Sequence, residues 1–246
     1  MTGRIRVGIG GWVYEPWRGS FYPVGLRQKD ELVYVGQHLT ATEINATYYS
    51  SQKPATFANW AKAMPDGFRF AVKASRYATN RKVLAEAGES IAKFVGQGIA
   101  ELGDRLGPIL WQFMATKRFD PDDFGAFLTL LPASVDGVPL RHALEVRHES
   151  FDDPAFLAMA REAGAAVVLA DHESYPAIVG HDVGFSYRRL MRTQADEPAG
   201  YGPADMERWV EDARRQAERG DVFSFFISGA KERNPAAAQA MIVSLG

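Results

Sequence analysis

The sequence contains no cysteine and no long hydrophobic run, and each absence excludes several kinds of protein. Without thiols the chain forms no disulfide, zinc–thiolate site or iron–sulfur cluster, and it has no cysteine nucleophile. The longest apolar stretch, Ala163 to Ala170, is far shorter than the about 18 residues of a membrane span. The opening residues MTGRIRVGIGGW form no apolar leader either. We therefore expect a cytoplasmic protein that does not bind membranes.

The chain also has little net charge and few of the motifs that identify common active sites. Its 28 Lys and Arg residues nearly balance 30 Asp and Glu residues, so any nucleic-acid binding would require a local basic patch. HExxH and GxSxG motifs are missing, which argues against zinc hydrolysis and acyl transfer. A metal site built from His148, Asp171, His172 and Glu173 is a weaker alternative. We predict neither a metal nor a cofactor, and the oligomeric state is left open.

Eight segments rich in β-branched and aromatic residues alternate with segments whose apolar residues repeat every three or four positions. The predicted strands are 4–10, 40–45, 68–73, 107–112, 141–146, 165–170, 183–189 and 221–227. Apolar spacing predicts amphipathic helices over 84–102 and 206–217. Asp120, Asp153 and Asn234 each precede a proline, a pattern typical of an N-cap followed by the first helical residue.

No linker, repeat or low-complexity tract divides the 246 residues. The pattern therefore predicts an α/β protein, a single-domain TIM (β/α)8 barrel over residues 1–246. The connection 171–182, between the sixth and seventh strands, has little helical pattern and is expected to be irregular. A doubly wound open sheet is the alternative. The glycines of GIGGW lack the spacing of a dinucleotide loop and are expected to turn the backbone at the barrel mouth.

Polar residues end six of the predicted strands, where TIM barrels place the groups that handle ligands. These residues are Glu43, Asn45, Lys73, Gln112, Glu145, Arg147, Asp171 and Arg189. Side chains two apart on a strand point the same way, so they are expected to surround one cavity. Three carboxylates and three cations suit a polar, anionic or hydroxyl-rich ligand. The alternative is a hydrogen-bonded plug in which the charges only neutralise one another.

Aromatic residues crowd the same predicted rim, at Trp12, Tyr14, Trp17, Tyr48 and Tyr49. Flat rings beside polar groups suit stacking on sugars or bases. Tyr14 and Tyr49 are the better ligand candidates because each also carries a hydroxyl. For Trp12 and Trp17 the alternative, a self-packed loop over the barrel, is favoured.

A phosphate site is a further hypothesis for the region after the eighth strand. Ser228-Gly229 precede the helix predicted at Asn234, a place where barrels often hold an anion on backbone N–H groups. Lys231 and Arg233 add positive charge there, and the run containing Arg188, Arg189 and Arg192 adds more nearby. The alternative is an ordinary turn and helix cap.

Four motifs, GIGGWVYEPWRGSFYP, EINATYYSSQKP, LGPILWQF and ALEVRHESF, occur in an order and spacing that resemble one family. The chain resembles the domain of unknown function 72 family, also called YecE-like, from Gly8 to about Asn234. The resemblance implies a TIM barrel and no defined activity. A distant similarity of that barrel to endonuclease IV implies nucleic-acid or phosphoester substrates. The polar pattern of the family falls on Tyr14, Trp17, Glu43, Asn45, Tyr49, Lys73, Gln112, Glu145, Arg147 and Arg189.

The sequence departs from the family pattern at several positions. Asn80 and Met191 stand where the family usually has histidine, and Met114 stands where it has proline. Ile227-Ser228 replace an expected pair of asparagines. These changes remove the side chains best suited to proton transfer or metal binding, and they weaken a metal-dependent nuclease interpretation.

The favoured hypothesis is a hydrolase-like pocket for a phosphorylated or polyhydroxylated small molecule. In it, Glu43 and Glu145 transfer protons, while Lys73, Arg147 and Arg189 hold the anion. Asn45, Gln112 and Tyr49 would orient the ligand. A nucleic-acid-binding barrel and a non-catalytic barrel that binds a protein partner are the alternatives.

Overall fold

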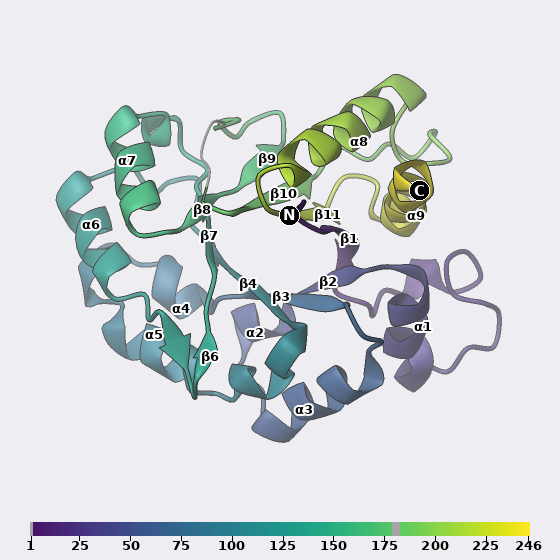
Figure 1. Cartoon of the computed structure of the whole chain (residues 1–246), viewed down its shortest axis with the longest axis horizontal. Coiled ribbons are helices and arrows are strands. Elements are labelled where there is room, and N and C mark those ends of the chain that lie inside the picture. Colours follow the sequence, from purple (N-terminus) through teal and green to yellow (C-terminus); the bar gives the residue numbers. More distant parts are fainter. Residues whose placement is uncertain (1, 179–182) are drawn as a thin grey trace.

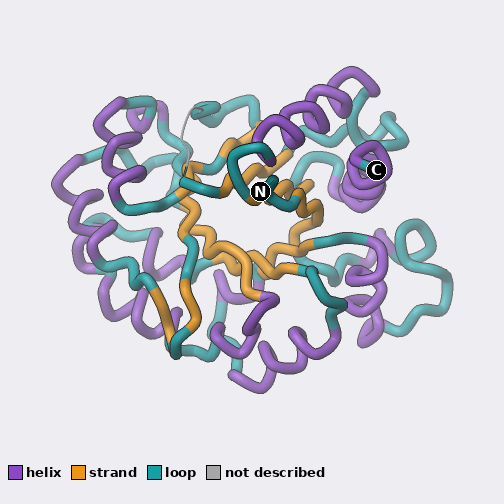
Figure 2. The backbone as a smooth tube through the Cα atoms, in the orientation of Figure 1, coloured by secondary structure: helices purple, strands orange, loops and turns teal. Residues whose placement is uncertain are grey.

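The central feature of the computed structural model, which describes residues 2–178 and 183–246, is a ring of parallel strands surrounded by helices (Figures 1 and 2). Its sheet has the strand order β8-β7-β4-β3-β2-β1-β11-β10-β9. The strands are β1 (Ile5–Gly10), β2 (Ala41–Ile44), β3 (Arg69–Lys73), β4 (Leu106–Gln112), β7 (His142–Glu145), β8 (Ala166–Val167), β9 (Leu169–Asp171), β10 (Phe185–Leu190) and β11 (Asp221–Phe226). A separate hairpin pairs β5 (Ser134–Val135) with β6 (Val138–Pro139).

The ring closes through a sixth barrel strand that is split in two at Val168. Its first part, β8, pairs with β7, and its second part, β9, pairs with β10. Between them the Val168 N–H donates to the carbonyl of Leu144 at 2.9 Å. The predicted strand 165–170 is therefore present but interrupted. The TIM-barrel prediction is confirmed, and the alternative of an open doubly wound sheet is wrong.

The helices lie around the outside of the ring (Figure 1). They are α1 (Glu31–His38), α2 (Ala46–Tyr49), α3 (Pro54–Ala63), α4 (Arg76–Thr79), α5 (Gly88–Val95), α6 (Pro121–Thr129), α7 (Pro154–Glu162), α8 (Pro203–Ala217) and α9 (Asn234–Leu245). The side chains of Asp120 and Asp153 accept backbone N–H bonds at the starts of α6 and α7, as the caps predicted. Across the described residues, no helix is long and apolar enough to cross a membrane.

Three local predictions differ from the structure. The cap at Asn234 is wrong, because Asn234 is already helical and its side chain accepts a bond from Thr193 instead. The helix predicted over 84–102 is broken: α5 ends at Val95, and Gly98 takes a positive φ of 107° before a 3₁₀ segment, Ile99–Arg105. Residues 172–178 of the predicted irregular connection contain no helix, and its residues 179–182 lie outside the described part.

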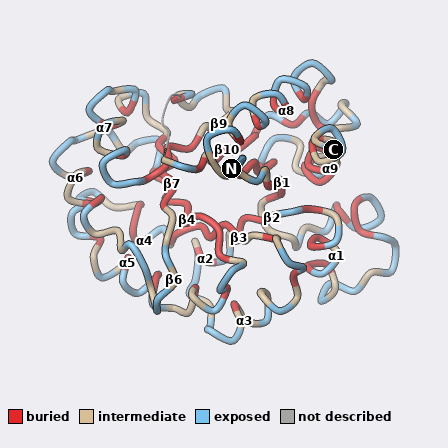
Figure 3. Tube along the Cα trace, viewed as in Figure 1, coloured by how far each residue is buried: buried red, intermediate tan, exposed pale blue. Residues whose placement is uncertain are grey.

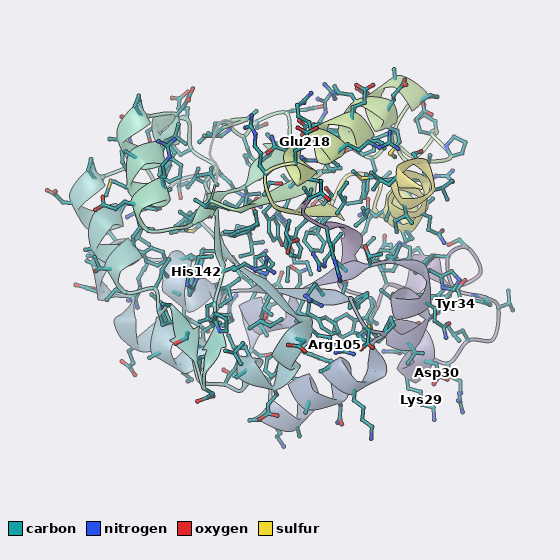
Figure 4. The ribbon with its side chains drawn as sticks, viewed as in Figure 1. Lys29, Asp30, Tyr34, Arg105, His142 and Glu218 are labelled. Atoms are coloured by element: carbon teal, nitrogen blue, oxygen red, sulfur yellow. The ribbon has the colours of Figure 1, made fainter. Side chains whose placement is uncertain are left out.

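Two apolar layers hold the barrel together, and the buried residues follow the strands (Figure 3). The larger layer lies between the strands and the helices. The smaller fills the barrel interior, where small residues such as Ala41, Ala71 and Ala143 face large ones such as Phe223 and Phe225. His142 alternates with Ala143 and faces outward, where it accepts a hydrogen bond from the Trp111 indole at 3.0 Å (Figure 4). The interior layer is apolar at its base and becomes polar at the carboxyl ends of the strands.

Candidate functional site

The polar upper layer of the barrel follows from the two-residue period of its strands. On β2, β3 and β7, the residue two positions after an interior alanine is Glu43, Lys73 and Glu145, respectively. On β10 the same alternation places Arg189 above Tyr187. The strands therefore deliver these charged side chains to one level at the barrel mouth.

Arg189 is the centre of a buried ionic network that we call the floor, made of Glu43, Gln112, Glu145, Tyr187 and Arg189. Its guanidinium binds Glu43 with two nitrogens, Nη2 to Oε1 at 3.1 Å and Nε to Oε2 at 3.2 Å. The third nitrogen, Nη1, donates to Glu145 Oε2 at 2.7 Å. Arg189 thus links β10 to both β2 and β7 across the barrel interior. Fork geometry of this kind is the arrangement in which arginine binds carboxylates most strongly.

Every carboxylate oxygen of the floor has a partner. The Tyr187 hydroxyl donates to Glu43 Oε2 at 2.7 Å, and Gln112 Nε2 donates to Glu145 Oε2 at 2.7 Å. Glu145 Oε1 accepts from both Nε and Nη2 of Arg147, at 2.9 and 2.8 Å. Both glutamates are 0% exposed. The two carboxylates are therefore sealed from the mouth by the side chains that bind them.

The electrostatics of the floor keep Glu145 ionised. Burial alone would raise the pKa of the Glu145 carboxyl, but Arg189 and Arg147 outweigh burial and lower the pKa to about 2. Burial, together with the neighbouring Glu43, raises the pKa of the Tyr187 hydroxyl well above its usual value. A sealed carboxylate that stays ionised is a poor proton donor to a ligand. The proton-transfer role expected for Glu43 and Glu145 does not fit this geometry.

Lys73, at the end of β3, differs from the other buried charges because no described residue forms an ion pair with it. Its side chain is only 8% exposed, and its Nζ lies 4.2 Å from the centre of the Tyr48 ring. In the described ranges 2–178 and 183–246 it forms no ion pair, since Glu43 and Glu145 are bound by Arg189. Burial and, secondarily, the positive charge of Arg189 lower the pKa of the Lys73 amine to about 8.

A cavity of about 530 Å³ opens above the floor at the barrel mouth. Six of the predicted ligand-binding residues line it: Asn45, Tyr49, Lys73, Gln112, Arg147 and, at its base, the floor residue Arg189. Trp12, Ile227, Ser228 and Lys231 line it as well, from the loops after β1 and β11. Gly11, with a φ of 72°, lets the chain turn at this rim, as expected from the GIGGW segment.

Three predicted ligand-binding residues do not reach this cavity. Trp17 is 1% exposed and its indole N–H donates to the Lys231 carbonyl at 2.9 Å, so it packs the loop rather than a ligand. Tyr14 packs edge-on against Trp17 and carries the Lys231 ammonium 4.1 Å from its ring centre. Asp171 accepts a bond from the Tyr201 hydroxyl at 2.7 Å. The prediction that Trp17 binds a ligand is therefore replaced by a structural role. Tyr14 and Asp171 contact the site only indirectly.

The turn after β11 forms one wall of the cavity and is held by Thr193. Ser228 and Gly229 both take positive φ angles, of 65° and 57°. The Thr193 hydroxyl lies 3.2 Å from the carbonyl oxygens of Ser228 and Ala230 and 2.9 Å from Asn234 Oδ1. A positive φ is strained for serine, so the packing around Thr193 has to maintain this turn.

Replacing Gly229 by alanine is expected to destabilise the protein by about 2 kcal/mol or more. A Cβ at this position would lie 2.6 Å from Thr193 Oγ1 and 2.7 Å from the Thr193 carbonyl oxygen, in addition to the unfavourable φ. Gly137→Ala is the matched control, because Gly137 has a φ of 78° and no atom within 4 Å of such a Cβ. Urea unfolding of both variants separates the steric clash from the backbone strain. Equal losses in the two would show that Thr193 does not constrain the turn.

The residues of the alternative metal site are separated by their own local contacts. His148 accepts the Ser150 backbone N–H at 3.0 Å, and His172 accepts that of Ser174 at 3.1 Å and stacks on Tyr175. No group of three or more His, Asp or Glu side chains in the described ranges is arranged to hold a metal ion. The structure therefore gives no support to that alternative.

One aromatic residue of the site, Tyr187, was not predicted, and two rim residues, Tyr48 and Trp12, have a larger part in the site than expected. Tyr187 precedes Arg189 by two positions on β10, so strand alternation alone could have placed it on the interior face. Tyr48 was passed over for its neighbour Tyr49, yet it is the ring beneath Lys73, and its hydroxyl accepts a bond from Asn80 at 2.9 Å. Trp12 was expected to be self-packed, and it lines the cavity.

The fold and this mouth define a TIM-barrel protein with a polar cavity at the carboxyl ends of its strands. The model of the family described as "Protein of unknown function DUF72" matches residues 6–246. The chain belongs to this family, as its motifs suggested. No curated protein matches the chain.

Solved structures share this fold over nearly the whole chain. A DUF72 family protein from Thermotoga maritima is 21% identical, with a TM-score of 0.77 and coverage of 98% of this chain and 99% of that one. A DUF72 family protein from Enterococcus faecalis is 18% identical, with a TM-score of 0.71 and 99% of each chain covered. SacUVDE is 11% identical, with a TM-score of 0.61 and 99% of each chain covered. At these identities the comparison establishes the shared barrel.

Proposed function

We propose that the mouth of the barrel binds an anionic, hydroxyl-bearing small molecule, such as a phosphorylated sugar. The observation that carries the proposal is Lys73, a nearly buried amine that lines the cavity without an acidic partner among the described residues. Burying an unpaired charge costs folding free energy, so such a group is typical of a ligand site. An anionic oxygen in the cavity would provide the missing partner.

The balance of charge around the cavity supports an anion. Its lining includes Lys73, Arg147, Arg189 and Lys231, and no carboxylate among the residues that the structure describes. Glu43 and Glu145 lie beneath and neutralise the two arginines. Among the described residues Lys73 and Lys231 form no ion pair with a floor carboxylate, and Lys231 rests on the Tyr14 ring. A cavity of one charge sign attracts and holds a ligand of the opposite sign.

The uncharged lining residues suit the rest of such a ligand. Asn45, Tyr49, Gln112 and Ser228 offer amide and hydroxyl groups, and Trp12 offers a flat ring against which a sugar can stack. The volume of about 530 Å³ lies within the range of small-molecule sites. Because the floor glutamates are sealed, the proposal is one of binding, and it does not include the hydrolysis expected from paired carboxylates.

Thermal unfolding and calorimetry with a matched ligand panel test this proposal. Glucose 6-phosphate is expected to stabilise the protein, by about 2.7 kcal/mol at 100 times its dissociation constant, and glucose much less. Lys73→Met is expected to lower the affinity for the phosphorylated ligand at least tenfold. Lys62→Met, on the exposed face of α3, is the control and leaves binding unchanged.

The proposal fails if no phosphorylated or carboxylated ligand shifts the unfolding temperature. It also fails if Lys73→Met and Lys62→Met bind the ligand equally. A protein that responds to none of the panel would favour the alternative role of a barrel that binds a protein partner.

A second candidate is a single-stranded nucleic acid, favoured by one specific observation. Tyr49 and Tyr77 are 64% and 61% exposed, and both line a second cavity that shares Tyr49 with the mouth. Arg81 and Lys93 also line that cavity, so bases could stack on tyrosines while phosphates meet cations. This function requires oligonucleotide affinity to fall steeply as salt rises, and a flat dependence would exclude it.

A further inference from the structure

We propose that the Lys73 amine forms a reversible imine with a ligand that carries an aldehyde or ketone as well as an anionic group. The inference rests on the proposed binding function and narrows its ligand class to anionic carbonyl compounds. It starts from the position of Lys73 at the carboxyl end of β3, where its side chain borders the mouth cavity.

The first requirement of imine formation is a neutral amine near neutral pH, because an ammonium group has no lone pair to attack a carbonyl carbon. Lys73 is 8% exposed and unpaired, and the positive guanidinium of Arg189 is among the charges that act on it. These features give a pKa of about 8, so about a tenth of the amine is neutral at pH 7. An ordinary lysine at the same pH is neutral in fewer than about one molecule in a thousand.

The second requirement is a fixed nitrogen that faces an open space. The Thr47 hydroxyl donates to the backbone carbonyl of Lys73 at 2.7 Å and fixes the end of β3. The Tyr48 ring lies 4.2 Å from Nζ, and the Tyr48 hydroxyl accepts a bond from Asn80 that holds this ring in place. The amine is therefore positioned by its neighbours, while the cavity leaves room for a ligand carbon.

The third requirement is a partner for the anionic group of the same molecule. Arg147 and Lys231 line the same cavity as Lys73. Arg147 uses Nε and Nη2 on Glu145, and its side chain is 21% exposed, so it remains open to a ligand oxygen. A small anionic carbonyl compound can thus meet a cation with its charged end while its carbonyl carbon approaches Lys73.

The step balances without an oxidant or a second reactant. The neutral Nζ attacks the carbonyl carbon, a C–N bond forms as the C=O π bond breaks, and one proton passes from the nitrogen to the oxygen to give a carbinolamine. The nitrogen then loses its remaining proton as the hydroxyl departs, and one water molecule is released with formation of the C=N bond. Hydrolysis reverses each event. Glu43 and Glu145 are sealed and take no part, so the protons exchange with solvent.

Trapping with sodium borohydride tests the inference, because hydride converts an imine to a stable secondary amine. Dihydroxyacetone phosphate carries the ketone, and glycerol 3-phosphate is its matched alcohol without a carbonyl. We expect the ketone and borohydride together to add the mass of one ligand less one oxygen atom, located at Lys73 by peptide mapping. Labelling of Lys73 should be at least tenfold faster than that of exposed Lys62. Glycerol 3-phosphate should give no adduct and should slow labelling by competition.

Lys73→Arg separates this inference from the proposed function. Arginine keeps the positive charge but forms no such imine, so the variant should still bind glycerol 3-phosphate and should lose the adduct. If the wild-type protein binds both phosphates but Lys73 is labelled no faster than Lys62, the proposed imine is wrong and the proposed anion binding is retained. If no phosphorylated or carboxylated ligand binds and no adduct forms, both proposals are wrong.

Discussion

Replacing Glu145 by glutamine is expected to reduce the free energy of unfolding by about 3 to 5 kcal/mol. Glutamine keeps the shape of the side chain but removes the charge that Arg189 and Arg147 both contact. Arg189 is 3% exposed and would retain only Glu43 as a partner in the barrel interior. Urea unfolding at pH 7 measures the loss. Glu207→Gln, on the exposed face of α8, is the control and should change stability by less than about 0.5 kcal/mol.

The same carboxylate makes stability depend on acid. The pKa of Glu145 falls from 4.5 to about 2 on folding, so its stabilising contribution is complete above about pH 4.5. That contribution is lost as the pH falls toward 2. The Glu145→Gln variant should therefore differ most from the wild type at neutral pH and least near pH 2. A difference that stays constant over this range would show that the charge of Glu145 is not what holds Arg189.

Replacing Lys73 by methionine is expected to have the opposite effect and to stabilise the protein by about 2 kcal/mol at pH 7. The pKa of the Lys73 amine is lowered on folding from 10.5 to about 8, mainly because the charged form is buried. Methionine has a similar length and no charge, so it removes this penalty. Urea unfolding measures the gain, and the same variant should lose the bound anion. Stability gained as binding is lost is typical of residues retained for function.

The pH dependence of this gain identifies its origin. The penalty for charged Lys73 is fully present below pH 8 and shrinks as the pH rises toward 10.5, because the folded protein then holds a neutral amine. The advantage of Lys73→Met should therefore be smaller at pH 9.5 than at pH 7. Lys62→Met should show neither the gain nor its decline. If the Lys73→Met variant were less stable than the wild type at pH 7, burial of the charged Lys73 amine would not be what destabilises the folded protein.

The order of strands and helices was predictable because each buried strand is a compact run of apolar residues. The ends of the strands were informative too, since Lys73, Gln112 and Arg189 were expected at the barrel mouth from their positions there. The break at Val168 was not predictable, because Ala165 to Ala170 reads as one continuous strand and only closure of the ring divides its hydrogen bonds. The end of α5 was missed because apolar spacing continued past Gly96 and Gly98.

The membership of the site was more predictable than the role of each residue in it. Strand ends identified the charged residues, yet both a ligand pocket and a self-neutralised plug agreed with that pattern. The structure has two levels, a plug around Arg189 and an open cavity with Lys73 at its edge. Which carboxylate pairs with which cation depends on distances across the barrel, and a sequence carries no such distances. Loop residues such as Trp12 and Trp17 were least predictable, because neighbours distant in sequence decide their exposure.

Because the sixth strand is split, the floor has a second role that limits which positions of the barrel can change. β7 and β10 lie on either side of the split, and Arg189 of β10 joins Glu145 of β7 across it. The same ion pair therefore lies beneath the mouth cavity and connects the two sides of the ring at its shortest strands. A substitution in the floor risks opening the barrel. Trp12, Tyr49 and Ser228 lie at the rim of the cavity and take no part in this ion pair. We therefore expect new ligand preferences to arise through substitutions at the rim, while the Arg189–Glu145 ion pair is retained.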